Sequence, residues 1–163
     1  MLNLTRPSVA MMDAALAGDD ALAEVLGHSV APGWATFREA LQPTRDAVAA
    51  APLDFAWGTR FFVVDDPRRL VGWGGFKGSP HDGVVELGYE IAEAERGRGY
   101  ATEATLAMLA EALADDDVTT VIAHTLPELN ASNRVLEKAG FVFDRPVSVD
   151  GESVWRFIKH RSE

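Results

Sequence analysis

The sequence of 163 residues contains no cysteine. Disulfide bonds, thiolate metal sites and a cysteine nucleophile are therefore excluded. The chain also lacks any uninterrupted apolar run as long as a membrane span, and its N-terminus does not combine a basic region with an apolar stretch. We therefore expect a cytoplasmic protein that does not use a membrane as a partner.

Basic residues are also scarce. Lysine and arginine number 15 against 25 aspartate and glutamate residues, which gives a formal net charge of −10. A sequence-independent nucleic-acid binder needs a basic stripe, so we expect no nucleic-acid partner. An acidic surface maintains solubility and mildly favours cationic partners such as amines. The four histidines lack the spacing of metal ligands, so we expect no metal, and we interpret His124 as a satisfied core residue of a predicted buried strand.

The remaining composition is that of a globular protein. Apolar residues make up 47% of the chain, and we find no internal repeat or linker. Length and composition together predict a single domain over residues 1–163. In the first third, the pattern predicts a short strand at 2–6 followed by helices, with a break at Gly18 and an interruption at Pro43.

The middle of the chain has a strand pattern followed by a helix pattern. Aromatic and β-branched residues predict three strands with short connections, and hence an antiparallel meander, at 59–66, 68–76 and 84–92. The apolar face of the following helix is assigned by its spacing to Thr102, Leu106, Leu109 and Leu113.

The last third predicts a buried strand at 118–125, a short helix between Asn130 and Gly140, and two closing strands around Asp150. The strand–helix–strand crossover from Val84 to Thr125 makes a parallel pair. We therefore predict an α+β fold, that is, a mixed α/β fold with a mostly antiparallel central sheet flanked by helices.

The segment ERGRGYATEA, Glu95–Ala104, places two arginines and two glycines directly before the helix pattern. The first N–H groups of a helix lack internal partners, the helix dipole is positive there, and glycine lets backbone amides approach a phosphate. A strand, a glycine-rich turn and a helix in this order therefore predict a phosphate-binding loop. The segment lacks the Gly-Lys-Ser/Thr ending of a nucleotide loop, and Thr102 stands where a dinucleotide loop has its third glycine. By itself, this short pattern is more typical of an arginine-rich turn without a ligand.

Two motifs together carry a resemblance to a known family. The string from Arg96 to Ala101 matches Arg-x-x-Gly-x-Ala, and NASNRVLEKAGFVF, Asn130–Phe143, follows it after one helix and one strand. These motifs resemble the acetyl-CoA loop and the second signature of the GCN5-related N-acetyltransferase superfamily, in particular its branch of ribosomal-protein N-terminal acetyltransferases. The resemblance implies a sheet splayed between the family's fourth and fifth strands, an acetyl-CoA-binding core at about 59–159 and an acceptor side at about 1–58.

The resemblance also implies which residues hold acetyl-CoA. The backbone at Ile91 and Ala92 should pair with the pantetheine arm and hydrogen-bond the thioester oxygen. Amides of the glycine-rich turn should bind the pyrophosphate, with two arginines as charge partners. The members of this turn are Arg96, Gly97, Arg98, Gly99, Tyr100 and Ala101.

Acyl transfer to an amine needs a proton acceptor, because an alkyl amine with a pKa of about 10.4 is mostly protonated at neutral pH. The resemblance places this base at Glu86, acting directly or through water, on a strand face shared with the runner-up Glu90. Many relatives protonate the leaving thiolate with a tyrosine, but Leu136 occupies the corresponding position. An Asn-x-Ser arrangement replaces it in the N-terminal-acetyltransferase branch. This implies that Ser132 protonates the thiolate or only hydrogen-bonds to it, and that Asn130 is a ligand of the cofactor arm. Both residue types are also ordinary helix caps.

These features predict an acetyl-CoA-dependent N-acetyltransferase in which a primary amine attacks directly in a ternary complex. The acceptor is a protein N-terminus or a small-molecule amine. One alternative is a non-catalytic acyl-CoA-binding regulatory module, because the tyrosine is missing. Another is a nucleotide-binding protein that uses the same glycine-rich turn. The resemblance is compatible with a homodimer, which no feature of the sequence decides.

Overall fold

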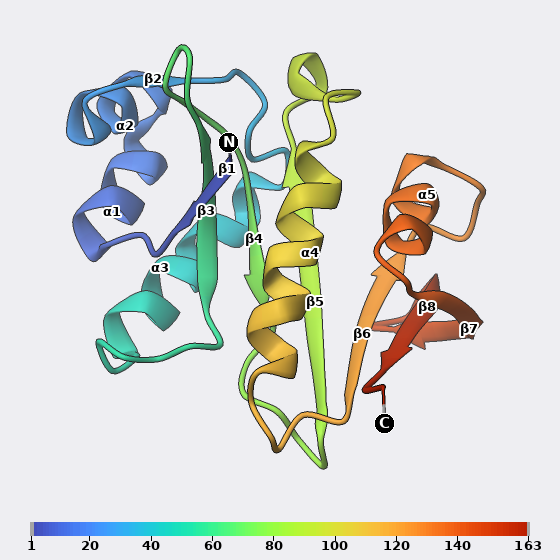
Figure 1. Ribbon diagram of the computed structural model, residues 1–163. Helices are drawn as coiled ribbons and strands as arrows, with labels where there is room; N and C mark the ends of the chain where they lie inside the picture. The colour runs from blue at the N-terminus through green and yellow to red at the C-terminus, as the bar shows by residue number, and fades with distance from the viewer. Residues whose placement is uncertain (1, 163) are drawn as a thin grey trace. The chain divides into compact units, whose positions relative to one another are not determined.

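In a computed structural model that describes residues 2–162, the chain divides into two compact units. The first unit comprises residues 2–75 and 89–100, and the second comprises residues 76–88 and 101–162. Strand β5 (Val84–Ile91) and helix α4 (Tyr100–Leu113) each contribute residues to both units (Figure 1).

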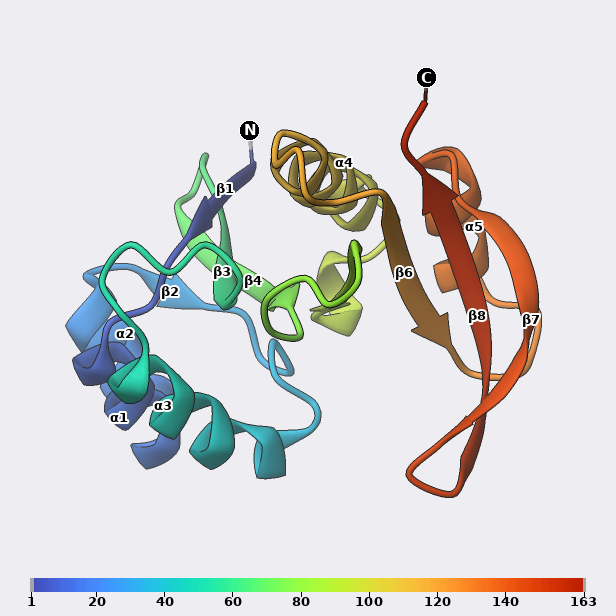
Figure 2. The same ribbon diagram turned by 90° about the horizontal axis from the view of Figure 1, so that it is seen from below.

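The first unit contains a small sheet and three α-helices. Strand β3 (Thr59–Val64) pairs antiparallel with both β1 (Leu2–Thr5) and β4 (Arg69–Phe76), and β2 (Ser29–Val30) pairs parallel with the start of β4. The helices lie on one face of these strands (Figure 2) and span Val9–Ala17 (α1), Asp19–Leu26 (α2) and Leu41–Ala50 (α3). The predicted strands and the helix break at Gly18 are confirmed, whereas β2 and a 3₁₀ turn at Arg38–Ala40 were not predicted.

Pro43 does not interrupt the third helix, so this prediction is wrong. Helix α3 begins at Leu41 and runs through the proline to Ala50. The proline stands in the first turn of the helix, where a backbone N–H has no partner within the helix and its loss has no consequence. Leu41, which is 1% exposed, fixes this turn on the core.

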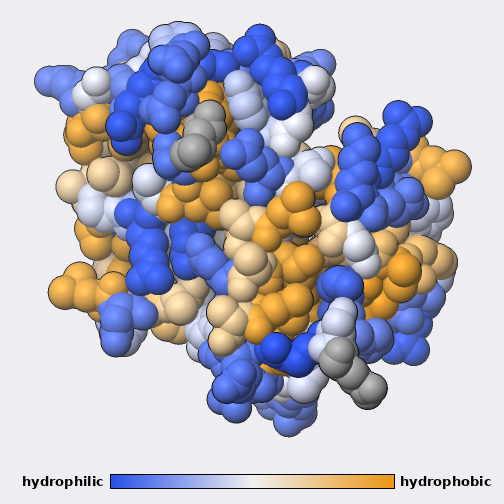
Figure 3. All heavy atoms as spheres, viewed as in Figure 1, coloured by the Kyte–Doolittle hydropathy of each residue, from blue (hydrophilic) through white to orange (hydrophobic). Residues whose placement is uncertain are grey.

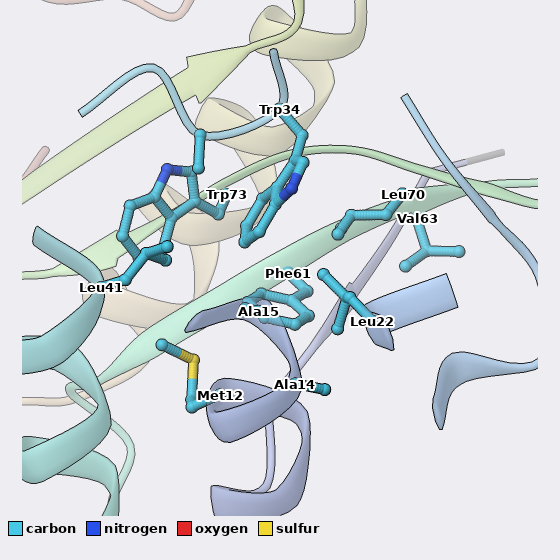
Figure 4. Close-up of a cluster of buried hydrophobic side chains, with 11 residues drawn as sticks. Met12, Ala14, Ala15, Leu22, Trp34, Leu41, Phe61, Val63, Leu70 and Trp73 are labelled. Carbon is cyan, nitrogen blue, oxygen red and sulfur yellow. The ribbon is translucent and has the colours of Figure 1, made fainter. Parts of the chain in front are cut away.

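The core of the first unit is centred on Trp34. Its fully buried ring lies edge-on to Phe61 and Trp73, at centroid distances of 5.2 and 5.6 Å, and its Nε1 donates to Asp19 Oδ1 at 3.0 Å. Met12, Leu22 and other side chains of the three helices complete the cluster (Figure 4). Trp34 is therefore a structural residue of this unit, which unites helices and strands in a single apolar cluster.

The second unit contains the crossover and the closing hairpin that the sequence predicts. Strand β5 pairs parallel with β6 (Thr120–Thr125), β6 pairs antiparallel with β8 (Glu152–His160), and β8 pairs antiparallel with β7 (Val142–Val149). Helix α5 spans Ala131–Lys138, is capped by Asn130 as predicted, and is followed by Gly140 at a φ of +92°. The predicted mixed, mostly antiparallel fold is confirmed.

The parallel pairing of β5 with β6 is short. Its register runs from Val84–Thr120 to Glu86–Ile122 and ends there, although β5 continues to Ile91 and β6 to Thr125. These two strands correspond to the family's fourth and fifth strands. Within this unit, β5 therefore does not pair with β6 beyond Ile122. A sheet that is splayed between these two strands requires such an early end of their pairing.

The buried face of helix α4 differs from the predicted one. Leu106 is 46% exposed, and the buried residues of α4 are Ala104, Thr105, Met108, Leu109 and Ala112. The helix contains many alanines, so several faces satisfy the apolar spacing equally well. Small side chains allow a helix to pack closely against its neighbours. The buried face of α4 is therefore the one that carries the small residues together with Met108.

Several large apolar side chains are exposed, among them Phe37 at 63%, Leu53 at 103% and Leu129 at 88%. Figure 3 shows apolar side chains mixed with polar ones over one face of the molecule. Within residues 2–162, no helix is both long and apolar enough to cross a membrane.

Truncating Trp34 tests the importance of this core. We expect Trp34→Ala to lower the free energy of unfolding by about 3–5 kcal/mol, because it removes two aromatic contacts and leaves a cavity. Urea unfolding followed by circular dichroism measures this change. Phe37→Ala, at an exposed aromatic side chain, is the matched control and should change stability by less than about 0.5 kcal/mol. Equal effects of the two substitutions would contradict the central position of Trp34.

Candidate active site

The glycine-rich turn lies between β5 and helix α4. Strand β5 ends at Ile91, a 3₁₀ turn covers Glu93–Glu95, and α4 begins at Tyr100. Gly97 and Gly99 have φ angles of +79° and +82°, in the left-handed region that favours glycine. A Cβ at either glycine would meet no atom within 4 Å. The glycines are therefore needed for the backbone conformation, and the space around them is open to a ligand.

An ion pair fastens this turn to strand β4. Arg69 Nε lies 2.8 Å from Glu95 Oε1, and Arg69 Nη2 lies 2.9 Å from Glu95 Oε2. Both side chains are mostly buried, at 13% and 12% exposure. The hydrogen bonds and charge of Arg69 lower the pKa of Glu95, and those of Glu95 raise the pKa of Arg69. Arg69 also donates to the hydroxyl of Tyr100 at 3.4 Å, so it holds both ends of the turn.

The two arginines of the turn have different surroundings. Arg98 Nη1 lies 3.6 Å from Glu95 Oε2, so its charge shares a carboxylate with Arg69. Arg96 Nε donates to the carbonyl of Ile91 at 3.1 Å, and no carboxylate among the described residues pairs with Arg96. Both side chains are exposed. Arg96 therefore offers the less compensated positive charge of the two.

Ile91 and Ala92 are buried, and one of their two backbone N–H groups donates a hydrogen bond to strand β4. The N–H of Ala92 donates to the carbonyl of Val71 on β4 at 2.8 Å. Because adjacent amides of a strand point to opposite sides, the N–H of Ile91 points away from β4. Of the two predicted positions, the amide of Ile91 is the one directed away from the neighbouring strand.

Glu86 makes two charge-assisted contacts in the second unit. Its Oε1 lies 2.7 Å from His124 Nδ1 and its Oε2 lies 2.8 Å from Lys77 Nζ. The side chains of Glu86 and His124 are 19% and 13% exposed. The Nε2 atom of His124 is buried, and no described residue gives it a hydrogen-bond partner. The interpretation of His124 as a satisfied core residue is therefore wrong, because one ring nitrogen has no partner and the β6 strand is buried only at alternate residues.

Glu90, the runner-up for the base, is held by two donors of the first unit. Its Oε1 accepts from the backbone N–H of Thr36, and its Oε2 accepts from Trp73 Nε1 at 2.9 Å. Both carboxylate oxygens thus have donors. Glu90 and Glu86 share the polar face of β5, as predicted, while Val85 and Leu87 are buried on the other face.

The Asn-x-Ser arrangement lies at the start of helix α5. Asn130 Oδ1 accepts from the backbone N–H of Asn133 at 3.2 Å, which is a helix cap. Ser132 is half-buried in the first turn, and Leu136 is fully buried. Cofactor binding by Asn130 and catalysis by Ser132 remain predictions. Ala101, the last member of the predicted turn, stands in the first turn of α4, where its carbonyl accepts from Thr105 Oγ1 at 2.7 Å.

The structure adds three residues to which the sequence analysis gave no role in the site: Glu95, Arg69 and His124. Glu95 lies three residues before Arg98, a spacing that favours a local ion pair. No sequence pattern pointed to Arg69, because its pairing depends on a contact between residues far apart in the chain. Within residues 2–162, no group of three or more His, Asp or Glu side chains is arranged to hold a metal ion.

Comparison with known proteins now decides the family. A family model described as the acetyltransferase (GNAT) domain matches residues 5–142, which is most of the chain. The chain belongs to the GNAT acetyltransferase family. GNAT enzymes use acetyl-CoA, so the protein is an acyltransferase with acetyl-CoA as its co-substrate. The resemblance stated from two sequence motifs is thereby confirmed.

Individual relatives agree with this assignment. The uncharacterized N-acetyltransferase YjdG of Bacillus subtilis (strain 168) is 27% identical over 146 residues, covering 88% of this chain and 87% of YjdG. A GNAT-family acetyltransferase from Bordetella pertussis superposes with a TM-score of 0.70 at 22% identity, covering 97% of this chain and 95% of its own. RimL, a ribosomal L7/L12 alpha-N-protein acetyltransferase solved with coenzyme A, has a TM-score of 0.67 at 14% identity, with 98% and 93% coverage. These structures share the GNAT fold with this chain.

The Arg69–Glu95 pair makes stability depend on pH. The pKa of Glu95 is lower in the folded protein than in the unfolded chain, so its contribution is present above the unfolded pKa and is lost as pH falls through the folded pKa. We expect Glu95→Gln to lower the free energy of unfolding by about 1–3 kcal/mol at pH 7. The difference from the wild type should shrink below a pH of about 4.3.

Urea unfolding at several pH values measures this difference. Glu93→Gln is the matched control, because Glu93 is an exposed carboxylate of the same 3₁₀ turn. A pH-independent effect of Glu95→Gln, or an equal effect of Glu93→Gln, would contradict the assigned role of the pair.

Proposed function

We propose that this GNAT protein transfers an acetyl group from acetyl-CoA to a primary amine by direct attack in a ternary complex. The acceptor is a protein N-terminus or a small-molecule amine. The observation that carries the proposal is the turn from Arg96 to Tyr100, where two left-handed glycines precede the first turn of a long helix. Such a turn presents backbone amides and the positive end of the helix dipole to a phosphate.

In this proposal the cofactor is held by both backbone and charge. The amides of Arg98, Gly99, Tyr100 and Ala101 bind the pyrophosphate, and Gly97 sets the conformation of the turn. Arg96 supplies the main positive charge, because Arg98 shares Glu95 with Arg69. The backbone of Ile91 and Ala92 binds the pantetheine arm, with the amide of Ile91 as its donor, and Asn130 contacts the same arm.

The chemistry needs loss of a proton from the amine and gain of a proton by the thiolate. In this proposal Glu86 removes the first proton, directly or through water, and Ser132 supplies the second. The absence of cysteine agrees with direct attack, since no thiol can carry the acetyl group. An acidic chain favours cationic acceptors at long range, and we propose that it works in the cytoplasm as a single catalytic domain, alone or as a homodimer.

A substitution in the turn tests cofactor binding. We expect Gly99→Asp to weaken acetyl-CoA binding about 100-fold or more, because it strains the backbone and sets a carboxylate beside the pyrophosphate. Isothermal titration with acetyl-CoA measures this loss, and ATP and NAD serve as comparison ligands. Gly33→Asp is the matched control, since Gly33 is an exposed glycine at a φ of +78° with open space around it. Retained affinity in Gly99→Asp, or tighter binding of ATP or NAD, would contradict the proposed role of the turn.

A panel of amines tests the transfer reaction. We expect acetyl-CoA to release thiol only when an acceptor is present, measured with a thiol reagent and confirmed by mass spectrometry of the acetylated amine. The panel contains free amino acids, a short peptide with a free N-terminus, spermidine and kanamycin. Peptides with a blocked N-terminus and no lysine are the negative control. Binding of acetyl-CoA without amine-dependent thiol release from any member would contradict the proposed transfer to these amine classes.

A further inference from the structure

A carboxylate and an imidazole lie in contact on the polar face of the second unit. Glu86 Oε1 and His124 Nδ1 are 2.7 Å apart, and both side chains are mostly buried. At this distance one proton lies between the two atoms. If it resides on Nδ1, the ring donates to the carboxylate and presents a basic lone pair at Nε2.

Both carboxylates of strand β5 already have donors at each oxygen. Glu86 accepts from His124 at one oxygen and from Lys77 at the other. Glu90 accepts from Thr36 and Trp73. An incoming amine would therefore compete with these contacts for the carboxylate oxygens. The proton acceptor is therefore to be sought in a neighbouring group.

The Nε2 atom of His124 is such a group. It is buried and has no partner among residues 2–162. Leaving a buried polar atom without a partner costs about 1–3 kcal/mol, and native proteins normally supply a partner from the chain, from water or from a ligand. Of the two ring nitrogens, Nε2 is therefore the one that the described residues leave without a hydrogen bond.

We propose that His124 Nε2 is the base that takes the proton from the acceptor amine and that Glu86 is the positioning residue that orients the ring. This inference rests on the proposed function and changes its base from a carboxylate to a carboxylate–imidazole pair. The general pattern is a base whose orientation and tautomer are set by a hydrogen-bonded acid. Glu86 also stabilises the imidazolium that forms, because its charge lies at Nδ1.

The proton and bond changes balance as follows. The ammonium form of the acceptor gives one proton to Nε2, directly or over one water. The neutral nitrogen then attacks the thioester carbon, so a C–N bond forms and the C–S bond breaks. The sulfur leaves with the electron pair of that bond and takes a proton from Ser132, which recovers a proton from the nitrogen. The imidazolium returns its proton to solvent, so one proton is released in each turnover.

Two cationic groups flank the pair. Lys77 contacts the far oxygen of Glu86, and Arg156 on β8 is the cross-strand partner of His124 and shares its face of the sheet. The Nε atom of Arg156 is also buried without a partner in the described part of the chain. The pair thus lies between Lys77 on one side and Arg156 on the other.

The first test determines where the ring protons reside. We expect long-range proton–nitrogen NMR spectra of the ¹⁵N-histidine-labelled protein to show a neutral ring with its proton on Nδ1 at neutral pH, with and without acetyl-CoA. The signal is assigned by its absence in His124→Asn. Glu86→Gln should increase the share of the Nε2–H tautomer. A wild-type ring protonated on Nε2, whether neutral or as imidazolium, would overturn the proposal, and this test needs no acceptor amine.

The second test measures turnover with the amines of the panel. We expect His124→Asn, which keeps a donor to Glu86, to lower kcat by about 100-fold or more while the Kd for acetyl-CoA stays within about threefold. The acidic limb of the kcat/KM profile should disappear in this variant, a change that a purely structural role would not produce. Glu86→Gln should lower kcat by about tenfold, and its kcat/KM profile should still have an acidic limb. His81→Asn is the matched control, because His81 is 93% exposed.

The two tests separate this inference from the proposed function. If the wild type acetylates a panel amine but His124→Asn retains its kcat and its acidic limb, the base assignment is overturned and the N-acetyltransferase function stands. If the wild type acetylates no panel amine, the proposed transfer fails, and the NMR measurement still decides whether the pair has the proposed tautomer.

Discussion

The ion pair between Arg69 and Glu95 is the interaction on which the glycine-rich turn depends. It joins the first residue of β4 to the residue before Arg96, and both of its hydrogen bonds are short and mostly shielded from water. A turn with two left-handed glycines has many accessible conformations when unrestrained. Fixing one end of it on the sheet reduces this freedom before the cofactor arrives, which is the usual advantage of preorganisation.

This pair also distributes the charges of the turn. Glu95 partly compensates Arg98, while Arg96 has no carboxylate partner among the described residues and remains directed by its contact with the Ile91 carbonyl. An acidic protein with a net charge of −10 repels a polyanionic cofactor at long range. In the proposed function, the exposed Arg96 at the turn before helix α4 offsets that repulsion locally.

The polar face of strand β5 carries Glu86 and Glu90, and each carboxylate is held by two donors. Glu90 contacts Trp73 and the backbone of Thr36 in the first unit. Glu86 contacts His124 on the neighbouring strand and Lys77 in the second unit. The two glutamates therefore have separate structural surroundings although they lie only four positions apart on one strand.

Much of this protein follows from its sequence. Strand and helix patterns, the crossover from Val84 to Thr125 and the Asn130 cap were sufficient for the fold class, because these depend on local periodicity and short spacings. The GNAT family and acetyl-CoA followed from the resemblance that two short motifs carry. The tertiary structure alone decided the buried face of α4, the path of the helix through Pro43, the Arg69–Glu95 pair and the unpartnered Nε2 of His124. Each of these depends on which distant side chains meet, and a linear pattern does not contain that information.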